Sequence, residues 1–320
     1  MRTFKIFLTL IVMLLCCLSV SAHDFEVDGI YYKITSSTDK IVEVTYRGGN
    51  NILYPERYSD AVCIPESVNY NGNTYGVTSI GDGAFQYCSG LTSVVIPNSV
   101  TSIGYGAFND CDGLNSLTIG TGVLSIGSGQ CAPKKTIWLT NTPPSGWANL
   151  KGTINYVANE QYGSSSNVKV YPYLSSMFET NGIKYVPVSP SERTCDAIDC
   201  NYDSAVEEIN IGETVSYRGV SMTVKNVMPY VAYGQKTVKK LSVSHKGDVG
   251  DKAFYGCTAI TNATISNEGN IGTSAFEGAM KFVNATINIT NKGNIGEKAF
   301  YGCTAITNAT ISNEGNIGTS

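Results

Sequence analysis

The sequence contains very few histidines, tryptophans and charged side chains. Of its 320 residues, 2 are histidine and 2 are tryptophan, and charged residues make up 15%. Two histidines leave little material for a histidine-based metal or catalytic site. The net charge of −4 argues against a nucleic-acid-binding protein, which would need a basic patch. An apolar content of 42% is too high for a disordered chain, so we expect a folded protein without nucleic-acid partners.

Motifs for catalysis are also missing. The sequence has no phosphate-binding loop and no metalloprotease helix. Its acidic residues are scattered, so no two of them stand out as a candidate catalytic pair of a glycosidase. Cys131 and His245 are the only candidates for nucleophilic chemistry, and they lie in different halves of the chain without a third group to orient them. We therefore predict no catalytic residue, no metal and no cofactor.

Long apolar runs are absent after the N-terminus. A basic start and an apolar run over residues 6–18 lead to the small side chain of Ala22. This pattern indicates a secretory signal peptide at residues 1–22, cleaved between Ala22 and His23. The residue before Cys16 is Leu15, whereas a lipid-attachment signal has a small residue there, so lipoprotein anchoring is disfavoured. No later stretch is long enough to cross a bilayer, so we predict a secreted or cell-surface protein.

Internal repetition is the dominant signal. An Ala-Phe pair recurs at intervals of 22 to 24 residues within each half of the chain, and residues 252–274 are identical to residues 298–320. One such unit buries too few side chains to offset the conformational entropy of folding about 23 residues. Neighbouring units must therefore stack and share a core, which predicts a solenoid. The pairs are Ala84-Phe85, Ala107-Phe108, Ala253-Phe254, Ala275-Phe276 and Ala299-Phe300.

One unit carries a family resemblance. Its apolar positions follow the pattern Leu91-x-x-Val94-x-Ile96-Pro97-x-x-Val100-x-x-Ile103-Gly104-x-x-Ala107-Phe108-x-x-Cys111. This pattern resembles the BspA-like leucine-rich repeats of bacterial surface antigens, over about 80–130 and 228–320, although the later units lack the proline. The resemblance implies a mostly β leucine-rich-repeat solenoid. It also implies attachment to host matrix proteins or to other bacteria, with which family members are associated.

A longer duplication predicts two modules, each with a β-hairpin cap followed by a solenoid. Residues 25–32 parallel 178–185, and residues 64–72 parallel 211–219, where strand alternation flanks a turn. The predicted boundaries are a signal peptide at 1–22, a cap at 23–77, a first repeat block at 78–130, a closing and connecting segment at 131–177, a second cap at 178–227 and a second repeat block at 228–320.

The second repeat block is expected to be truncated. The sequence stops at Ser320, where an Ala-Phe pair should follow, as it does after Ser274. The last strand would then have an unpaired edge and an uncovered core side. We expect self-association through this uncapped C-terminal end.

Eight cysteines follow the signal peptide. A local disulfide between Cys195 and Cys200 is one interpretation of that pair, and no histidine or second pair accompanies them to suggest a metal site. Four other cysteines share one position in successive coils, where we interpret them as small buried hydrophobic residues. They are Cys88, Cys111, Cys257 and Cys303.

Strand alternation defines a candidate binding face. It places one side of each strand in the core and the other in solvent. The outward residues are small, polar and nearly uncharged, and in the second block they are expected to stack as asparagine and threonine ladders. A solvated surface without function is one interpretation, and a broad protein-binding surface is the other. The residues are Ser93, Val95, Ser116 and Thr118 in the first block, and Asn262, Thr264, Asn284, Thr286, Asn308 and Thr310 in the second.

Three functions remain open. The favoured hypothesis is a secreted or cell-surface protein that binds protein ligands, with the host extracellular matrix or other bacterial surfaces as partners implied by the resemblance. The alternative is a structural spacer that presents a missing C-terminal domain. An enzyme is the remote third hypothesis.

Overall fold

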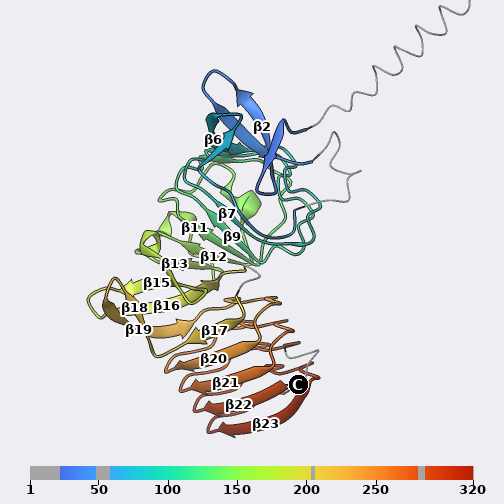
Figure 1. Ribbon diagram of the computed structural model, residues 1–320. Helices are drawn as coiled ribbons and strands as arrows, with labels where there is room; N and C mark the ends of the chain where they lie inside the picture. The colour runs from blue at the N-terminus through green and yellow to red at the C-terminus, as the bar shows by residue number, and fades with distance from the viewer. Residues whose placement is uncertain (1–21, 48–57, 203–205, 280–284, 320) are drawn as a thin grey trace, which may run out of the picture.

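The computed structural model describes residues 22–47, 58–202, 206–279 and 285–319, and the mostly β solenoid predicted from the sequence is confirmed (Figure 1). The predicted signal peptide lies outside these residues except for Ala22. Within the described ranges there is no α-helix, and the helical content is three short 3₁₀ turns. These are η1 (Trp147–Leu150), η2 (Glu160–Tyr162) and η3 (Leu174–Ser176).

Two sheets are built from residues 25–170, the part of the chain that we call the first module. One is antiparallel at its start, and short parallel strands from the repeats extend it. It has the order β1 (Phe25–Val27), β2 (Ile30–Ser36), β3 (Ile41–Thr45), β6 (Asn73–Ile80), β8 (Ser102–Ile103) and β10 (Ser125–Ile126), with β5 (Ser67–Tyr70) paired to β6. The other is parallel throughout. It has the order β13 (Val168–Val170), β12 (Ile154–Val157), β11 (Lys135–Trp138), β9 (Ser116–Ile119), β7 (Leu91–Ile96) and β4 (Asp60–Cys63).

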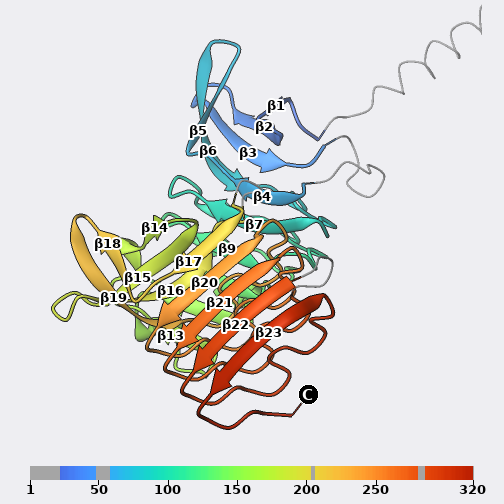
Figure 2. The ribbon, with the colours of Figure 1, turned by 60° about the horizontal axis from the view of Figure 1, so that its bottom comes forward.

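Two further sheets are built from residues 178–313, the part of the chain that we call the second module. The cap sheet has the order β14 (Phe178–Thr180), β15 (Ile183–Ser189), β16 (Thr194–Cys200), β19 (Val220–Val227) and β18 (Thr214–Tyr217). The repeat sheet is parallel, and its strands lie side by side in Figure 2. It has the order β17 (Glu208–Ile211), β20 (Lys240–His245), β21 (Asn262–Asn267), β22 (Ala285–Asn291) and β23 (Ile306–Asn313).

The phenylalanine of each Ala-Phe pair forms an aromatic spine inside each stack. Phe85 and Phe108 stack with ring centroids 5.1 Å apart and planes 2° apart. Phe276 lies between Phe254 and Phe300 at 5.1 Å from each. The first four rings are fully buried, and Phe300 is half-buried. One ring per coil therefore sets the same stacking distance in both modules.

An asparagine ladder runs along the strand ends of the second module. Asn267, Asn291 and Asn313 occupy one register position of three neighbouring strands. The Nδ2 of Asn267 donates to Oδ1 of Asn291 at 3.1 Å, and Asn291 donates to Asn313 at 2.7 Å. Each Nδ2 also donates to the carbonyl of a glycine two residues later. A Cβ on one of these glycines, Gly293, would lie 2.2 Å from the carbonyl oxygen of the coil before it, so only glycine fits there.

The repeated cysteines are mainly buried, as interpreted from the sequence. Cys88, Cys111 and Cys257 are at most 3% exposed, and Cys303 is half-buried. Their thiols also link coils. Cys111 Sγ donates to the Phe85 carbonyl at 2.9 Å, and Cys257 and Cys303 make equivalent contacts with the preceding coil at 3.1 and 3.0 Å.

Candidate functional site

The outward side of the second module's repeat sheet is exposed, and we call it the second-module face. In β21, Asn262 and Thr264 are exposed, whereas Ala263 and Ile265 between them are buried. The predicted residues Asn308 and Thr310 of β23 are also exposed, and Thr286 of β22 is partly exposed. Asn284 lies outside the described residues. The face comprises Glu208, Asn210, Lys240, Ser242, Ser244, Asn262, Thr264, Ser266, Thr286, Asn288, Thr290, Asn308, Thr310 and Ser312.

The predicted asparagine and threonine ladders on this face are wrong in register. Asn262 pairs with Thr286 rather than Asn284, and Thr264 pairs with Asn288. The unit leading to β22 is two residues longer than the one before it, and buried Ile289 and Asn291 keep their alignment with the preceding strand. A shift of two residues preserves the inward and outward directions. The outward rows therefore alternate asparagine with threonine, and the continuous asparagine ladder lies at the buried strand ends instead.

The chemistry of the second-module face is uniform. Its side chains carry hydroxyl and amide groups, and only Glu208 and Lys240, in the first two strands, are charged. These groups lie about 4.8 Å apart from one strand to the next and roughly 7 Å apart along each strand. Such a surface can donate and accept many hydrogen bonds, and its two charged side chains are exposed register partners at one end of the face.

The corresponding first-module face is buried, which corrects the sequence prediction. It is the outward side of β7, β9, β11 and β12. Ser93 is 9% exposed, Ser116 2% and Thr118 4%, and Val95 alone among the predicted residues remains partly exposed. The face comprises Ser93, Val95, Ser116, Thr118, Lys135, Ile137, Ile154 and Tyr156.

The second module's cap sheet covers this face. In Figure 1 the cap sheet lies between β11–β13 and the second stack. Ile137 and Tyr156 of the first module share an apolar cluster with Val186 of β15 and Ile198 of β16. Alternation directed these side chains outward as expected, and the packing of one module on the other removed them from solvent.

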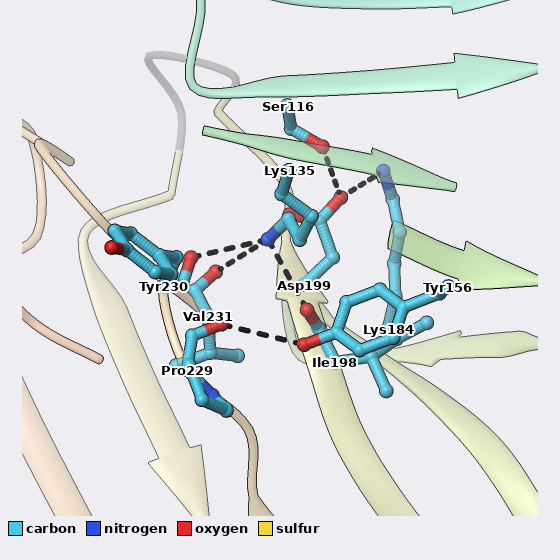
Figure 3. Close-up of polar contacts among 9 residues, drawn as sticks. All are labelled: Ser116, Lys135, Tyr156, Lys184, Ile198, Asp199, Pro229, Tyr230 and Val231. Atoms are coloured by element: carbon cyan, nitrogen blue, oxygen red, sulfur yellow. Dashed lines mark hydrogen bonds and ion pairs between the residues drawn. The ribbon is translucent and has the colours of Figure 1, made fainter. Parts of the chain in front are cut away.

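A buried ion cluster crosses the junction between the modules (Figure 3). Lys135 of β11 forms an ion pair with Asp199 of β16, and both side chains are 0% exposed. Lys184 of β15 contacts the same carboxylate at 3.0 Å. The hydroxyl of Ser116 donates to Oδ2 of Asp199, also at 3.0 Å. Two cations and a hydroxyl therefore satisfy one buried acid.

Backbone carbonyls complete the shell around Lys135. Its Nζ donates to the carbonyl oxygens of Ile198 and Tyr230 at 3.2 Å, and that of Val231 at 3.4 Å. Burial lowers the pKa of Lys135, although Asp199 opposes this effect. Burial would raise the pKa of Asp199, but the two lysines outweigh it and hold that pKa below its usual value. The geometry is that of a structural joint, because the Lys135 and Asp199 side chains have no contact with solvent.

A second buried acid lies nearby in β16. Asp196 accepts a hydrogen bond from the Tyr171 hydroxyl at 2.7 Å, and from the backbone and side-chain nitrogens of Asn226 at 3.1 and 3.2 Å. Burial raises the pKa of Asp196, against these hydrogen bonds. Sequence reasoning missed both acids and Lys135. The available signal was a pair of aspartates within an otherwise apolar strand, and a lysine beside Ile137 and Trp138.

The structure contradicts the local disulfide between Cys195 and Cys200. Both are free, buried thiols at the two ends of one strand. Five residues of extended chain span roughly 16 Å, well beyond the Cα separation of a disulfide, which is about 7 Å at most. Lys184 pairs with Asp199 and Tyr185 pairs with Ala197, so Ile198 is an extra residue that forms a bulge in β16. Asp199 and Ile198 therefore both face the first module, whereas both cysteines pack in the second core.

Groups for other functions are not assembled in the described part of the chain. Cys131 packs against the first core, whereas His245 belongs to the second module's repeat sheet. No three histidine, cysteine, aspartate or glutamate side chains of the described residues gather where they could hold a metal ion. The described residues also include no helix with the length and apolar character needed to span a membrane.

Parallel coils, an aromatic spine and an asparagine ladder define a leucine-rich-repeat solenoid. The family model for the BspA type leucine rich repeat region matches residues 63–140 and 227–320 in 6 copies. These ranges cover more than half of the chain, which therefore belongs to this family. Leucine-rich repeats of this kind suggest a role in binding proteins, and neither the family nor the fold is typical of enzymes.

Three solved structures illustrate the similarity. A leucine rich cell surface protein from Faecalibacterium prausnitzii A2-165 is 17% identical over 90% of this chain and 94% of its own, with a TM-score of 0.32. A leucine-rich repeat protein from Bacteroides ovatus ATCC 8483 is 19% identical over 92% and 91%, with a TM-score of 0.27. One from Bacteroides capillosus ATCC 29799 is 27% identical over 35% and 80%, with a TM-score of 0.29. The chain has no significant match among curated proteins.

Proposed function

We propose that this chain is a non-enzymatic secreted or cell-surface protein that binds other proteins through the second-module face. The observation that carries this proposal is the contrast between two equivalent surfaces. The first-module face is buried under the second cap, whereas the second-module face is exposed across five strands. The proposal includes the predicted signal peptide at 1–22 and the cap and repeat boundaries derived from the sequence.

The chemistry of the face favours a particular kind of partner. Its asparagine, threonine and serine groups suit a flat protein surface rich in hydrogen-bonding groups, such as host extracellular matrix proteins or proteins on other bacteria. Charge contributes little, because only Glu208 and Lys240 are charged. We therefore expect binding to depend weakly on salt, in contrast to adhesion driven by exposed opposite charges.

A binding experiment with residues 23–320 tests this function. The protein is passed over immobilised fibronectin, fibrinogen and bacterial surface extracts at two salt concentrations. Thr264→Arg and Asn288→Arg place long charged side chains in the middle of the face, and each should weaken binding at least about tenfold, equivalent to roughly 1.4 kcal/mol.

The matched control is Thr273→Arg. Thr273 is exposed in the same module, but it lies between β21 and β22 and outside the sheet. This variant should bind like the unmodified protein. Equal binding by all three variants would show that the ligand uses another surface. Absence of binding to every partner would favour the spacer hypothesis.

A further inference from the structure

The end of the first repeat block brings two cysteines together. The Ala-Phe pair is missing from this coil, and Gln130 replaces its backbone contacts. Gln130 Oε1 accepts a hydrogen bond from the Phe108 backbone at 2.8 Å, and its Nε2 donates to the carbonyl of Gly104 at 2.8 Å. This side chain holds the next turn of chain on the coil before it. Cys131 is thereby fixed beside Cys111.

Both backbone and side-chain contacts place Cys131 on the preceding coil. Its backbone N–H donates to the Phe108 carbonyl at 3.3 Å, and its Sγ lies 3.7 Å from the Cys111 carbonyl. Cys131 takes the position of Phe108 one repeat later, three residues before the position of Cys111, and its side chain reaches across to Cys111.

The two thiols differ in the way that a reactive pair requires. Cys131 is partly exposed, and its pKa lies below the usual value, chiefly through its side-chain interaction with Cys111. Cys111 is buried, and the interaction with Cys131 together with burial raises its pKa. An accessible thiolate beside a second thiol is the arrangement that favours oxidation to a disulfide.

We propose that Cys111 and Cys131 form a disulfide that staples the last coil of the first repeat block to the coil before it. The Cys131 thiolate attacks a protein or small-molecule disulfide outside the cytoplasm and forms a mixed disulfide, releasing one thiolate. Cys111 then loses its proton and attacks Cys131 Sγ, which releases the second thiolate. Two thiols of the chain are oxidised, one external disulfide is reduced, and the two protons pass to its thiols.

The other described cysteines provide internal controls. Cys257 and Cys303 occupy the equivalent position two coils apart, with Ala279 in the coil between them. Cys195 and Cys200 are held apart in one strand. Both pairs should therefore stay reduced under conditions that oxidise Cys111 and Cys131.

The test uses residues 23–320 carrying Cys63→Ser, which removes the one fully exposed cysteine among the described residues and prevents cross-linking between molecules. After treatment with oxidised glutathione, free thiols are alkylated under denaturing conditions, and peptides are mapped by mass spectrometry without reduction. We expect one cross-linked peptide pair, Cys111 to Cys131. Reduction should lower the melting temperature by about 5 °C, because the bond restricts the unfolded chain.

Two variants make the result decisive. Cys131→Ser should abolish the cross-link and the redox-dependent melting shift, and Cys303→Ser should change neither. Complete alkylation of both Cys111 and Cys131 after oxidation would overturn the proposal, as would a link from Cys111 to Cys88. These outcomes are independent of ligand binding, so they separate this inference from the proposed function.

Discussion

The two repeat sheets show that strand alternation sets the direction of a side chain, whereas tertiary packing sets its exposure. Both sheets are parallel and built from coils with the same aromatic spine. The first-module face carries Ile137, Tyr156 and Lys135 among its outward residues, and all three are fully buried. The second-module face carries only small polar side chains beyond its first two strands, and it stays in solvent. Bulky outward residues in a repeat strand therefore indicate a covered face.

The largest expected effect comes from breaking the joint that covers the first-module face. Asp199→Ala would leave Lys135 and Lys184 facing each other without their shared acid. Removal of one partner from a buried ion pair typically lowers the free energy of unfolding by about 3–5 kcal/mol. Urea denaturation measures this loss, and limited proteolysis should show faster cleavage near the junction between the modules.

The matched control for the joint is Lys239→Ala. Lys239 pairs with Glu207 at 2.5 Å, but both side chains are more than half exposed. Exposed ion pairs contribute about 0–1 kcal/mol, so this variant should remain close to the unmodified protein. A loss from Asp199→Ala no larger than that of the control would show that the buried cluster does not hold the modules together.

The aromatic spines allow a comparison between fully and partly covered coils. Phe108 is 0% exposed between two coils, whereas Phe300 is half-buried. Phe108→Ala should lower the free energy of unfolding by about 3–5 kcal/mol, as truncation of a core aromatic residue does. Phe300→Ala should lower it less, because part of that ring already contacts solvent. Chemical denaturation of both variants checks the order, and equal losses would contradict it.

Several features could be predicted from the sequence because they depend on local periodicity. The Ala-Phe spacing predicted the stack of coils with a shared core, and the alternation of Asn262, Ala263 and Thr264 predicted which side chains point outward. The burial of Ser116 could not be predicted in this way, since it depends on Asp199, which lies 83 residues further along the chain. The prediction of a Cys195–Cys200 disulfide was wrong because sequence spacing alone does not reveal that both residues lie in one extended strand.

A medium effect is expected at the asparagine ladder, a feature of the second module. Asn291 is 1% exposed and joins its neighbours on both sides. Asn291→Ala would remove one of the two acceptors that the buried Asn267 amide uses in the ladder, and an unsatisfied buried polar group costs about 1–3 kcal/mol. Thermal unfolding followed by circular dichroism measures the loss. Asn288→Ala, on the exposed side of the same strand, is the control and should have little effect.

The last expected effect is confined to acidic pH and concerns His245, which occupies the ladder position before Asn267. Its Nδ1 accepts a hydrogen bond from the Gly247 backbone at 3.0 Å, which requires that nitrogen to be unprotonated. Burial lowers the pKa of His245 from 6.5 to about 4, and Asp248 opposes the shift only in part. The unfolded chain therefore takes up this proton first as the pH falls, so stability should decrease below pH 6.5 and level off below about pH 4.

Comparison of the unmodified protein with His245→Asn isolates this contribution. A pKa shift of this size corresponds to a stability loss of about 2 kcal/mol between pH 7 and pH 5. Asparagine does not titrate and would continue the ladder of Asn267 and Asn291, so the variant should lack this part of the loss. Asp199, whose pKa is lowered, contributes in a more acidic range, as its stabilisation disappears only when the pH falls through that lowered value. Urea denaturation at pH 7 and pH 5 measures the difference, and parallel pH profiles for the two proteins would show that folding does not lower the pKa of His245.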